Sequence, residues 1–378
     1  MKIVMKFGGA SISSGEDLIK ALNIVKDHLS RDDQVIIIAS AFDNITDALQ
    51  DAAEKASRGE GDAMEARLRE IESRHIAIIE NAIIFDESLR REASERLGNQ
   101  IRELETILRG VMSIRELSCR SRDYILSFGE RFAAPIMADA LADSSLRARC
   151  FEGGEAGIVT DDSFGEARPL IELTRYEVQK RLSALERGTI PVIAGFIART
   201  QDGSVTTLGR GGSDLTATLV GRSVGADEVW LWSNVDGLMT ADPEIVPDAR
   251  PLGSVTFLEA QEMAYFGARV IHPMALEPAR EGGIKVRIKN LHNPSQAGTV
   301  IGGWLTSETA GVVRSLALIR DVALLTVSGA GMAGAPGVAA RVFSALGSER
   351  INVLMISQGS SAASMSVVIP TGGLRDAL

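Results

Sequence analysis

The sequence predicts an α/β protein: a three-layer α/β/α domain with a mostly parallel central sheet, followed by a small ferredoxin-like βαββ unit. Residues 2–7 are an apolar strand that runs into two glycines and then a helix-periodic segment. Residues 35–39 are a continuous apolar run, which is typical of a parallel strand covered on both faces. This strand–helix–strand order predicts a βαβ unit. Residues 322–369 show the order strand, helix, strand, strand, and a second helix would begin at Leu374.

The elements of the first half follow from capping residues and periodicity. Ser14 is a good N-cap, and the two acids after Gly15 favour a first helical turn. Residues 45–122 are charged, poor in glycine and helix-periodic, as in the repeat of Ile101, Leu104 and Leu108. We therefore expect a helical subregion there, with its charge runs on solvated helix faces.

Strands return after residue 150. Residues 189–196 predict a buried strand, and the Asp-Gly pair within 201–204 predicts a hairpin with a type I′ turn. Residues 228–232 predict another strand. Residues 285–289 alternate charged and apolar side chains, which predicts a half-exposed strand.

Length and composition limit the number of domains and the classes of partner. The 378 residues predict two domains or three, and we place one domain at 1–305 and a second at 318–378. Apolar residues make up 45% and charged residues 24%, as in ordinary globular proteins. The net charge of −10 argues against nucleic acid or a membrane surface as partner.

Targeting signals and cysteines point to one compartment. The N-terminus has no apolar segment of the signal-peptide kind, and no run of 18 apolar residues occurs. Two cysteines, Cys119 and Cys150, are too few for a disulfide scaffold or a cysteine-based zinc site. We therefore expect a cytoplasmic protein that has no membrane partner and no metal site built from its own side chains.

The first segment with chemistry is Lys6-Phe7-Gly8-Gly9-Ala10-Ser11. Two glycines between a strand and a helix let a polyanion approach the backbone N–H groups, and the lysine adds charge. A tight strand–helix turn without a ligand explains the same residues. The segment matches neither the P-loop nor the dinucleotide-binding pattern.

The second segment, residues 207–217, places three glycines around Arg210 before an apolar helix. Arg210 is suited to grip a carboxylate with two hydrogen bonds. Asp214 is compatible with a helix cap or with binding an ammonium group or metal.

Three further segments give weaker evidence for a functional site. Glu130-Arg131 is either a surface ion pair or part of a site. Residues 232–243 form a polar loop at the carboxyl end of a strand, where ligands of open α/β sheets bind. Arg269 could reach a phosphate, and His272 before proline is read as a turn residue, because no serine or cysteine nucleophile accompanies it.

These segments, in this order, resemble the aspartate kinases of the amino acid kinase family. The family's KFGGTS appears as KFGGAS at 6–11, GERLS as GERFA at 129–133, and TLGRGGSD is unchanged at 207–214. Its WTDVDG loop appears as WSNVDG at 232–237, and KVLHP as RVIHP at 269–273. The resemblance covers residues 2–300, and the segment 322–369 is similar to the family's first ACT regulatory domain.

The resemblance implies the amino acid kinase fold, ATP and Mg²⁺ as cofactors, and phosphorylation of the β-carboxylate of L-aspartate. It implies Lys6, Arg210 and Asp214 as catalytic residues. The implied aspartate-binding residues are Thr46, Glu130, Arg210, Gly211, Gly212 and Ser213. The implied nucleotide-binding residues are Lys6, Phe7, Gly8, Gly9, Ser233, Asn234, Met239, Arg269 and Val270.

The chain also departs from the family pattern. Ala10 replaces a threonine and Asp47 an asparagine, which adds a negative charge near bound anions. Asn234 replaces an aspartate, and Glu244 stands where an arginine is common, which removes a possible phosphate contact. Arg269 keeps the charge of a lysine but changes its shape.

The ACT segment implies feedback by threonine or lysine at an interface between ACT domains, hence a homo-oligomer of at least two chains. Asn352 and Gln358 would contact the effector. Relatives usually carry two such domains, and this chain ends within the first. Two other interpretations remain open: another small-acid kinase of the same fold, and a regulatory paralogue without catalysis.

Overall fold

The computed structural model describes residues 1–267, 271–303, 313–329, 332, 335–358 and 364–378. It divides into two compact units, Met1–Leu316 and Ala317–Leu378. The predicted limits of 1–305 and 318–378 remain predictions. Among the described residues, no helix is both long and apolar enough to cross a lipid bilayer.

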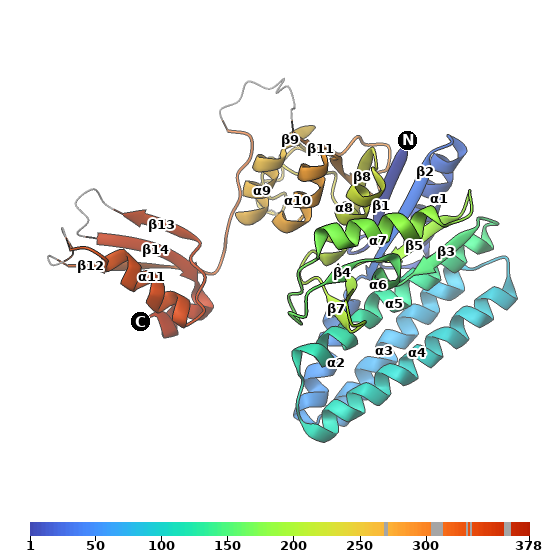
Figure 1. The fold of residues 1–378 in the computed structure, drawn as a ribbon, viewed down its shortest axis with the longest axis horizontal. Helices are drawn as coiled ribbons and strands as arrows, with labels where there is room; N and C mark the ends of the chain where they lie inside the picture. Colours follow the sequence, from blue (N-terminus) through green and yellow to red (C-terminus); the bar gives the residue numbers. More distant parts are fainter. Residues whose placement is uncertain (268–270, 304–312, 330–331, 333–334, 359–363) are drawn as a thin grey trace. The chain divides into compact units, whose positions relative to one another are not determined.

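The first unit is built around an eight-stranded sheet with strand order β3-β5-β2-β1-β8-β10-β11-β9 (Figure 1). Its neighbouring strands are parallel, except that β11 runs antiparallel to β10. The strands are β1 (Lys2–Gly9), β2 (Gln34–Phe42), β3 (Ala148–Phe151), β5 (Ile190–Ala194), β8 (Glu228–Ser233), β9 (Ser254–Thr256), β10 (Lys285–Asn290) and β11 (Thr299–Gly302). A small second sheet joins β4 (Val159–Thr160), β6 (Ile197–Thr200) and β7 (Val205–Thr207).

Helices cover both faces of the large sheet. The helices of this unit are α1 (Gly15–Ser30), α2 (Ile45–Arg58), α3 (Gly61–Ala82), α4 (Glu87–Ile114), α5 (Cys119–Asp143), α6 (Gly153–Ala156), α7 (Ile171–Ser183), α8 (Gly212–Val224), α9 (Phe257–Tyr265) and α10 (Pro273–Gly282). Helices α1 and α5 pack on one face, and α8 and α10 pack on the other. This is the predicted three-layer α/β/α arrangement.

Side-chain alternation along β1 explains the two layers. Ile3, Met5 and Phe7 lie in the core shared with α1 and α5, whereas Val4 lies in the core shared with α8 and α10. Because successive side chains of a strand point to opposite faces, one continuous apolar segment supplies both cores. The predicted βαβ start is confirmed: β1 pairs in parallel with β2, and Ser14 caps α1 by accepting from the Asp17 N–H.

The predicted helical subregion is formed by α2, α3 and α4, which pack together and against α5 (Figure 1). Leu104 and Leu108 of α4 are fully buried in this packing. The charge run at Arg67 lies on a partly exposed face, where its guanidinium pairs with Asp51 and Glu70.

One local prediction is wrong, and another holds except at one residue. The 201–204 hairpin joins β6 and β7, but Asp202 does not take a positive φ, which a type I′ turn requires at both central residues. Instead the Gly203 N–H donates to Thr200 O at 3.0 Å, and Gly203 alone has a positive φ of 91°. The segment 285–289 is β10, which shows the predicted alternation from the exposed Lys285 to the buried Ile288. Only Lys289 departs from it: β10 lies between β8 and β11, and Lys289 is buried.

The second unit has the predicted βαββ order. It contains β12 (Val322–Ser328), α11 (Val338–Ser348), β13 (Met355–Gln358), β14 (Ser364–Pro370), the 3₁₀ turn η2 (Thr371–Gly373) and α12 (Leu374–Ala377). The antiparallel sheet has the order β12-β14-β13. Leu346 of α11 packs against Met365, Val367 and Ile369 of β14, so one face of this sheet is covered.

Candidate active site

A cavity of about 620 Å³ lies in the first unit at the carboxyl ends of β1 and β2. Ligands of open α/β folds bind at such strand ends. Of the residues expected to act on the substrate, the structure gathers Lys6, Thr46, Glu130 and the loop 209–214 around this one cavity. Residues separated by more than 200 positions in the sequence therefore share one space.

Lys6 and Asp214 form an ion pair at the wall of the cavity. The Lys6 Nζ lies 2.9 Å from the Asp214 Oδ1, and both side chains are largely buried. Asp214 is not the N-cap of α8, because Gly211 occupies that position. Of the alternatives for Asp214, the structure therefore favours pairing with an ammonium group.

Glu130 is a buried acid in the wall of the cavity. Its side chain is only 2% exposed, and its Oε1 accepts a hydrogen bond from the Ala41 N–H at 3.0 Å. Its Oε2 has no partner among the described residues. Burial raises the pKa of Glu130 to about 8, because the charged carboxylate is poorly solvated there.

Glu130 and its neighbour Arg131 do not form a surface pair. Arg131 Nε lies 2.8 Å from a Glu152 oxygen, and its guanidinium lies over the rings of Tyr124 and Phe128. The two residues point to different places because consecutive positions of α5 lie about 100° apart. Only Glu130 belongs to the cavity.

The loop before α8 is shaped by glycines. Gly209 and Gly211 have φ values of 69° and 73°, in the left-handed region that favours glycine. A side chain at Gly211 would also meet the Cβ of His272 at 2.3 Å. This path exposes Arg210 at the cavity, where it forms no ion pair within the described part of the chain.

Ser213 connects this loop to β2 at the far side of the cavity. The Ser213 hydroxyl donates to the Ser40 Oγ at 3.0 Å. Gly212 packs closely on Phe196, since a Cβ there would lie 2.7 Å from the ring. Phe196 itself has a φ of 61°, a strained value for a non-glycine residue of the kind found near functional sites.

The expected phosphate segment lies at the end of β1. Gly8 has a φ of 122°, and a Cβ added to it would lie 2.6 Å from the Ser40 carbonyl oxygen. The Phe7 ring stacks on the buried Trp232 at 5.8 Å, so only the backbone of Phe7 is available to a ligand.

Gly8 and Gly9 allow a direct test of this geometry. Gly9 has a φ of 60° but nothing within 4 Å of its added Cβ, so alanine there costs about 1 kcal/mol of backbone strain. Gly8→Ala adds a clash with the backbone of Ser40. We expect Gly8→Ala to lower the free energy of unfolding in urea clearly more than Gly9→Ala, and equal losses would contradict the close approach.

The other expected nucleotide residues lie outside the cavity lining. Ser233 is the last residue of β8, which pairs in parallel with β1, and Asn234 follows it and is exposed. Met239 is half-buried, and its carbonyl oxygen accepts from the Ser315 hydroxyl at 3.0 Å. Arg269 and Val270 lie outside the described residues.

Several lining residues were not anticipated as site residues: Ser40, Asp47, Arg122, Asp123, Leu126 and Phe196. Asp123 is fully buried and accepts from the N–H groups of Gly165 and Thr207 and from the Thr207 hydroxyl. Burial raises the pKa of Asp123. Arg122, Leu126 and Glu130 recur at every fourth position, which puts them along one side of a helix and could have indicated a shared face.

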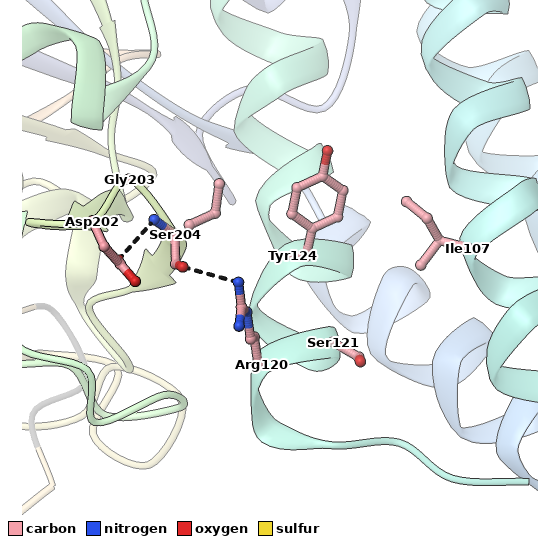
Figure 2. A pocket seen from close by; sticks show the side chains of 8 residues that line it. Ile107, Arg120, Ser121, Tyr124, Asp202, Gly203 and Ser204 are labelled. Carbon is pink, nitrogen blue, oxygen red and sulfur yellow. Dashed lines mark hydrogen bonds between the residues drawn. The ribbon is translucent and has the colours of Figure 1, made fainter. Parts of the chain in front are cut away.

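A second cavity of about 530 Å³ lies between α5 and the β6–β7 hairpin (Figure 2). Arg120 donates there to the Ser204 hydroxyl at 2.9 Å, and Tyr124 and Ile107 form the opposite wall. This cavity contains none of the expected site residues. Among the described residues, no three His, Cys, Asp or Glu side chains are grouped as a metal site.

Comparison with known proteins decides the family. The family described as the amino acid kinase family matches residues 1–290, which is most of the chain. The chain belongs to the amino acid kinase family. An ACT domain family matches residues 325–378, which contain β13, β14 and most of β12.

Relatives within the amino acid kinase family are aspartokinases. Aspartokinase 3, chloroplastic, of Arabidopsis thaliana is 36% identical over 376 residues, which cover 97% of this chain and 64% of the relative. A bifunctional aspartokinase/homoserine dehydrogenase of Zea mays is 32% identical over 97% of the chain and 40% of the relative. The chain thus spans less than two thirds of the length of these relatives.

Solved structures agree with the sequence relatives. The structure of aspartokinase III of E. coli in complex with aspartate and ADP matches with a TM-score of 0.83 and 29% identity, over 98% of this chain and 79% of that one. The same enzyme in complex with lysine and aspartate matches with a TM-score of 0.82 and 30% identity, with the same coverage.

Proposed function

We propose that this chain is an aspartate kinase, which transfers the γ-phosphoryl group of ATP to the β-carboxylate of L-aspartate. The product is 4-phospho-L-aspartate, the first intermediate toward lysine, threonine, methionine and isoleucine. The observation that carries the proposal is the 620 Å³ cavity, which brings together Glu130, Arg210 and the Lys6–Asp214 pair. The E. coli relative solved with aspartate and ADP supports it.

The residues of the cavity suit an amino acid with an extra carboxylate. Arg210 would hold a substrate carboxylate with two hydrogen bonds, and Glu130 would accept from the substrate ammonium. The carboxylate that attacks phosphorus is already a nucleophile, so the reaction needs no strong general base. The main barrier is the meeting of two anions, which Lys6 lowers by placing a positive charge beside the transferred group.

The nucleotide would lie along the same sheet edge. Gly8 and Gly9 would offer backbone N–H groups to the phosphates. Ser233 ends the neighbouring strand β8, and Asn234 and Met239 follow it along the chain. Roles for Arg269 and Val270 rest on the family pattern alone. Mg²⁺ would enter with the nucleotide and offset part of the phosphate charge when bound.

Regulation would come from the second unit. The ACT match and the E. coli enzyme solved with lysine support an amino acid effector, with lysine or threonine as candidates. Asn352 and Gln358, both exposed and near β13, would contact it. Such an effector would bind between ACT domains of two chains, so we propose a homo-oligomer.

An ADP-release assay with ATP–Mg²⁺ tests the activity. We expect release with L-aspartate and little with L-glutamate or without acceptor. Equal release with glutamate would favour another small-acid kinase of the same fold. A folded protein without acceptor-dependent release would favour a regulatory paralogue, and the same assay with threonine and lysine would report the effector.

A further inference from the structure

Arg122 is a cavity residue to which neither the family pattern nor the relatives assign a role. It lies in the first turn of α5 and lines the 620 Å³ cavity together with Leu126 and Glu130. These three positions are spaced by four residues, so they form a stripe along one side of the helix. At a rise of 1.5 Å per residue, Arg122 and Glu130 lie about 12 Å apart along the helix axis.

Nothing among the described residues accounts for the charge of Arg122. Its Nε is buried without a hydrogen-bond partner, and its guanidinium forms no ion pair within the part of the chain that the structure describes. The neighbouring carboxylate of Asp123 is instead occupied by Gly165 and Thr207. A cation in the first helical turn also opposes the helix dipole, so helix stability does not explain the arginine.

At the other end of this stripe, Glu130 has a hydrogen-bond acceptor without a partner in the described part of the chain, whereas Arg122 has a donor without one. The Oε2 of Glu130 is buried and has no partner among the described residues. Buried polar atoms are normally paired, because an unmade hydrogen bond is costly. A ligand with a carboxylate near Arg122 and an ammonium near Glu130 would satisfy both atoms.

We propose that Arg122 binds a carboxylate of the amino acid substrate, as a second guanidinium beside Arg210. This inference rests on the proposed function. A dicarboxylic amino acid brings two negative groups and one positive group into the cavity. Arg122 and Arg210 together with Lys6 supply the cations for the substrate and the phosphoryl group, and Glu130 supplies the acid. Arg122 is therefore a substrate-binding residue and takes no part in the chemical step.

The test compares Arg122→Gln with Arg120→Gln. Arg120 lies in the same turn of α5, is exposed, and faces the second cavity, where it donates to Ser204 (Figure 2). Losing a charged hydrogen bond to the substrate should raise the KM for aspartate about tenfold or more in Arg122→Gln. We expect the KM for ATP, the kcat and the Tm to stay near the wild-type values, and Arg122→Lys to recover part of the aspartate affinity.

Two results would overturn the role of Arg122. One is an aspartate KM that is equal in Arg122→Gln, Arg120→Gln and the wild type. The other is a thermal-shift result, which is needed if the wild type releases no ADP with aspartate. That lack of release would contradict the proposed function but not by itself the role of Arg122. Thermal stabilisation by L-aspartate and by succinate then decides, since bound ligands stabilise the folded state. Thermal stabilisation by the ligand that is lost in Arg122→Gln but kept in Arg120→Gln and the wild type supports the inference. The inference is overturned if the ligand stabilises Arg122→Gln as much as the wild type, or if it does not stabilise the wild type.

Discussion

Replacing Lys6 with methionine is expected to lower the kcat of aspartate-dependent ADP release by about 100- to 1000-fold, the range found for removal of one transition-state donor. Methionine keeps the length and the apolar stem of the side chain. It removes the only positive charge that β1 (Lys2–Gly9) places in the cavity, 2.9 Å from Asp214. Initial-rate kinetics with aspartate and ATP varied in turn would measure the effect.

Lys2→Met is the matched control, because it changes the same residue type on the same strand. The Lys2 Nζ donates to the Val224 carbonyl oxygen at 2.8 Å and does not line the cavity. Its kcat should remain within about twofold of the wild type. Because Lys6→Met also leaves Asp214 unpaired, Asp214→Asn and the double variant complete a cycle, in which we expect losses that do not add. A kcat for Lys6→Met close to that of Lys2→Met would contradict a catalytic role of Lys6.

The second large effect is expected at Glu130. In the ligand-free protein its pKa is about 8, so the carboxyl is mostly protonated at neutral pH. The substrate ammonium is held best by the ionised form. We therefore expect kcat/KM for aspartate to rise about tenfold per pH unit below pH 8 and to level off above it. In Glu130→Gln, kcat/KM should be about 10- to 100-fold lower at pH 8 and should lack this rise.

Stability should change with pH in the opposite direction. The pKa of Glu130 is raised from 4.5 to about 8 by burial, so the folded state keeps a proton that the unfolded state releases. The stability associated with that proton is complete below pH 4.5 and is lost as the pH rises through 8. Urea unfolding should thus show Glu130→Gln gaining stability relative to the wild type between pH 5 and 8.

Glu105→Gln serves as the control for both measurements. Glu105 is a carboxylate of the same type on the surface of α4, where it pairs with Arg109. Its removal should leave the pH profile of kcat/KM and the pH dependence of unfolding unchanged. A pH profile of Glu130→Gln that parallels the wild type would show that another group titrates near pH 8.

The sequence predicted the layered core well because its signal is local. Val35 to Ala39 are apolar at every position, and Ser14 caps the helix that precedes them, so β1, α1 and β2 could be placed without tertiary information. The burial of Lys289 could not be predicted from local sequence. Its ammonium donates to the Gln296 carbonyl oxygen and lies 5.4 Å from the ring of Trp232, so neighbouring strands bury a residue whose local pattern predicts exposure.

The candidate site was predictable where a residue type matched a known pattern, as at Lys6, Glu130 and Arg210. It was not predictable where a residue contributes only through the neighbours that folding brings to it. Ser40 lies within the apolar strand β2, and it faces the cavity where its hydroxyl meets Ser213. Phe196 lines the cavity and has a positive φ, and no residue type in its segment predicts that backbone conformation.

The buried carboxylate of Asp123 has a consequence for how the protein folds. It accepts hydrogen bonds from residues 42 and 84 positions away along the chain. Closing loops of that length costs chain entropy before any contact repays it, and contacts of long sequence separation slow folding. We therefore expect the glycine-rich loop that begins at Thr207 to take its final shape after α5 has docked, so that the 620 Å³ cavity forms late in folding.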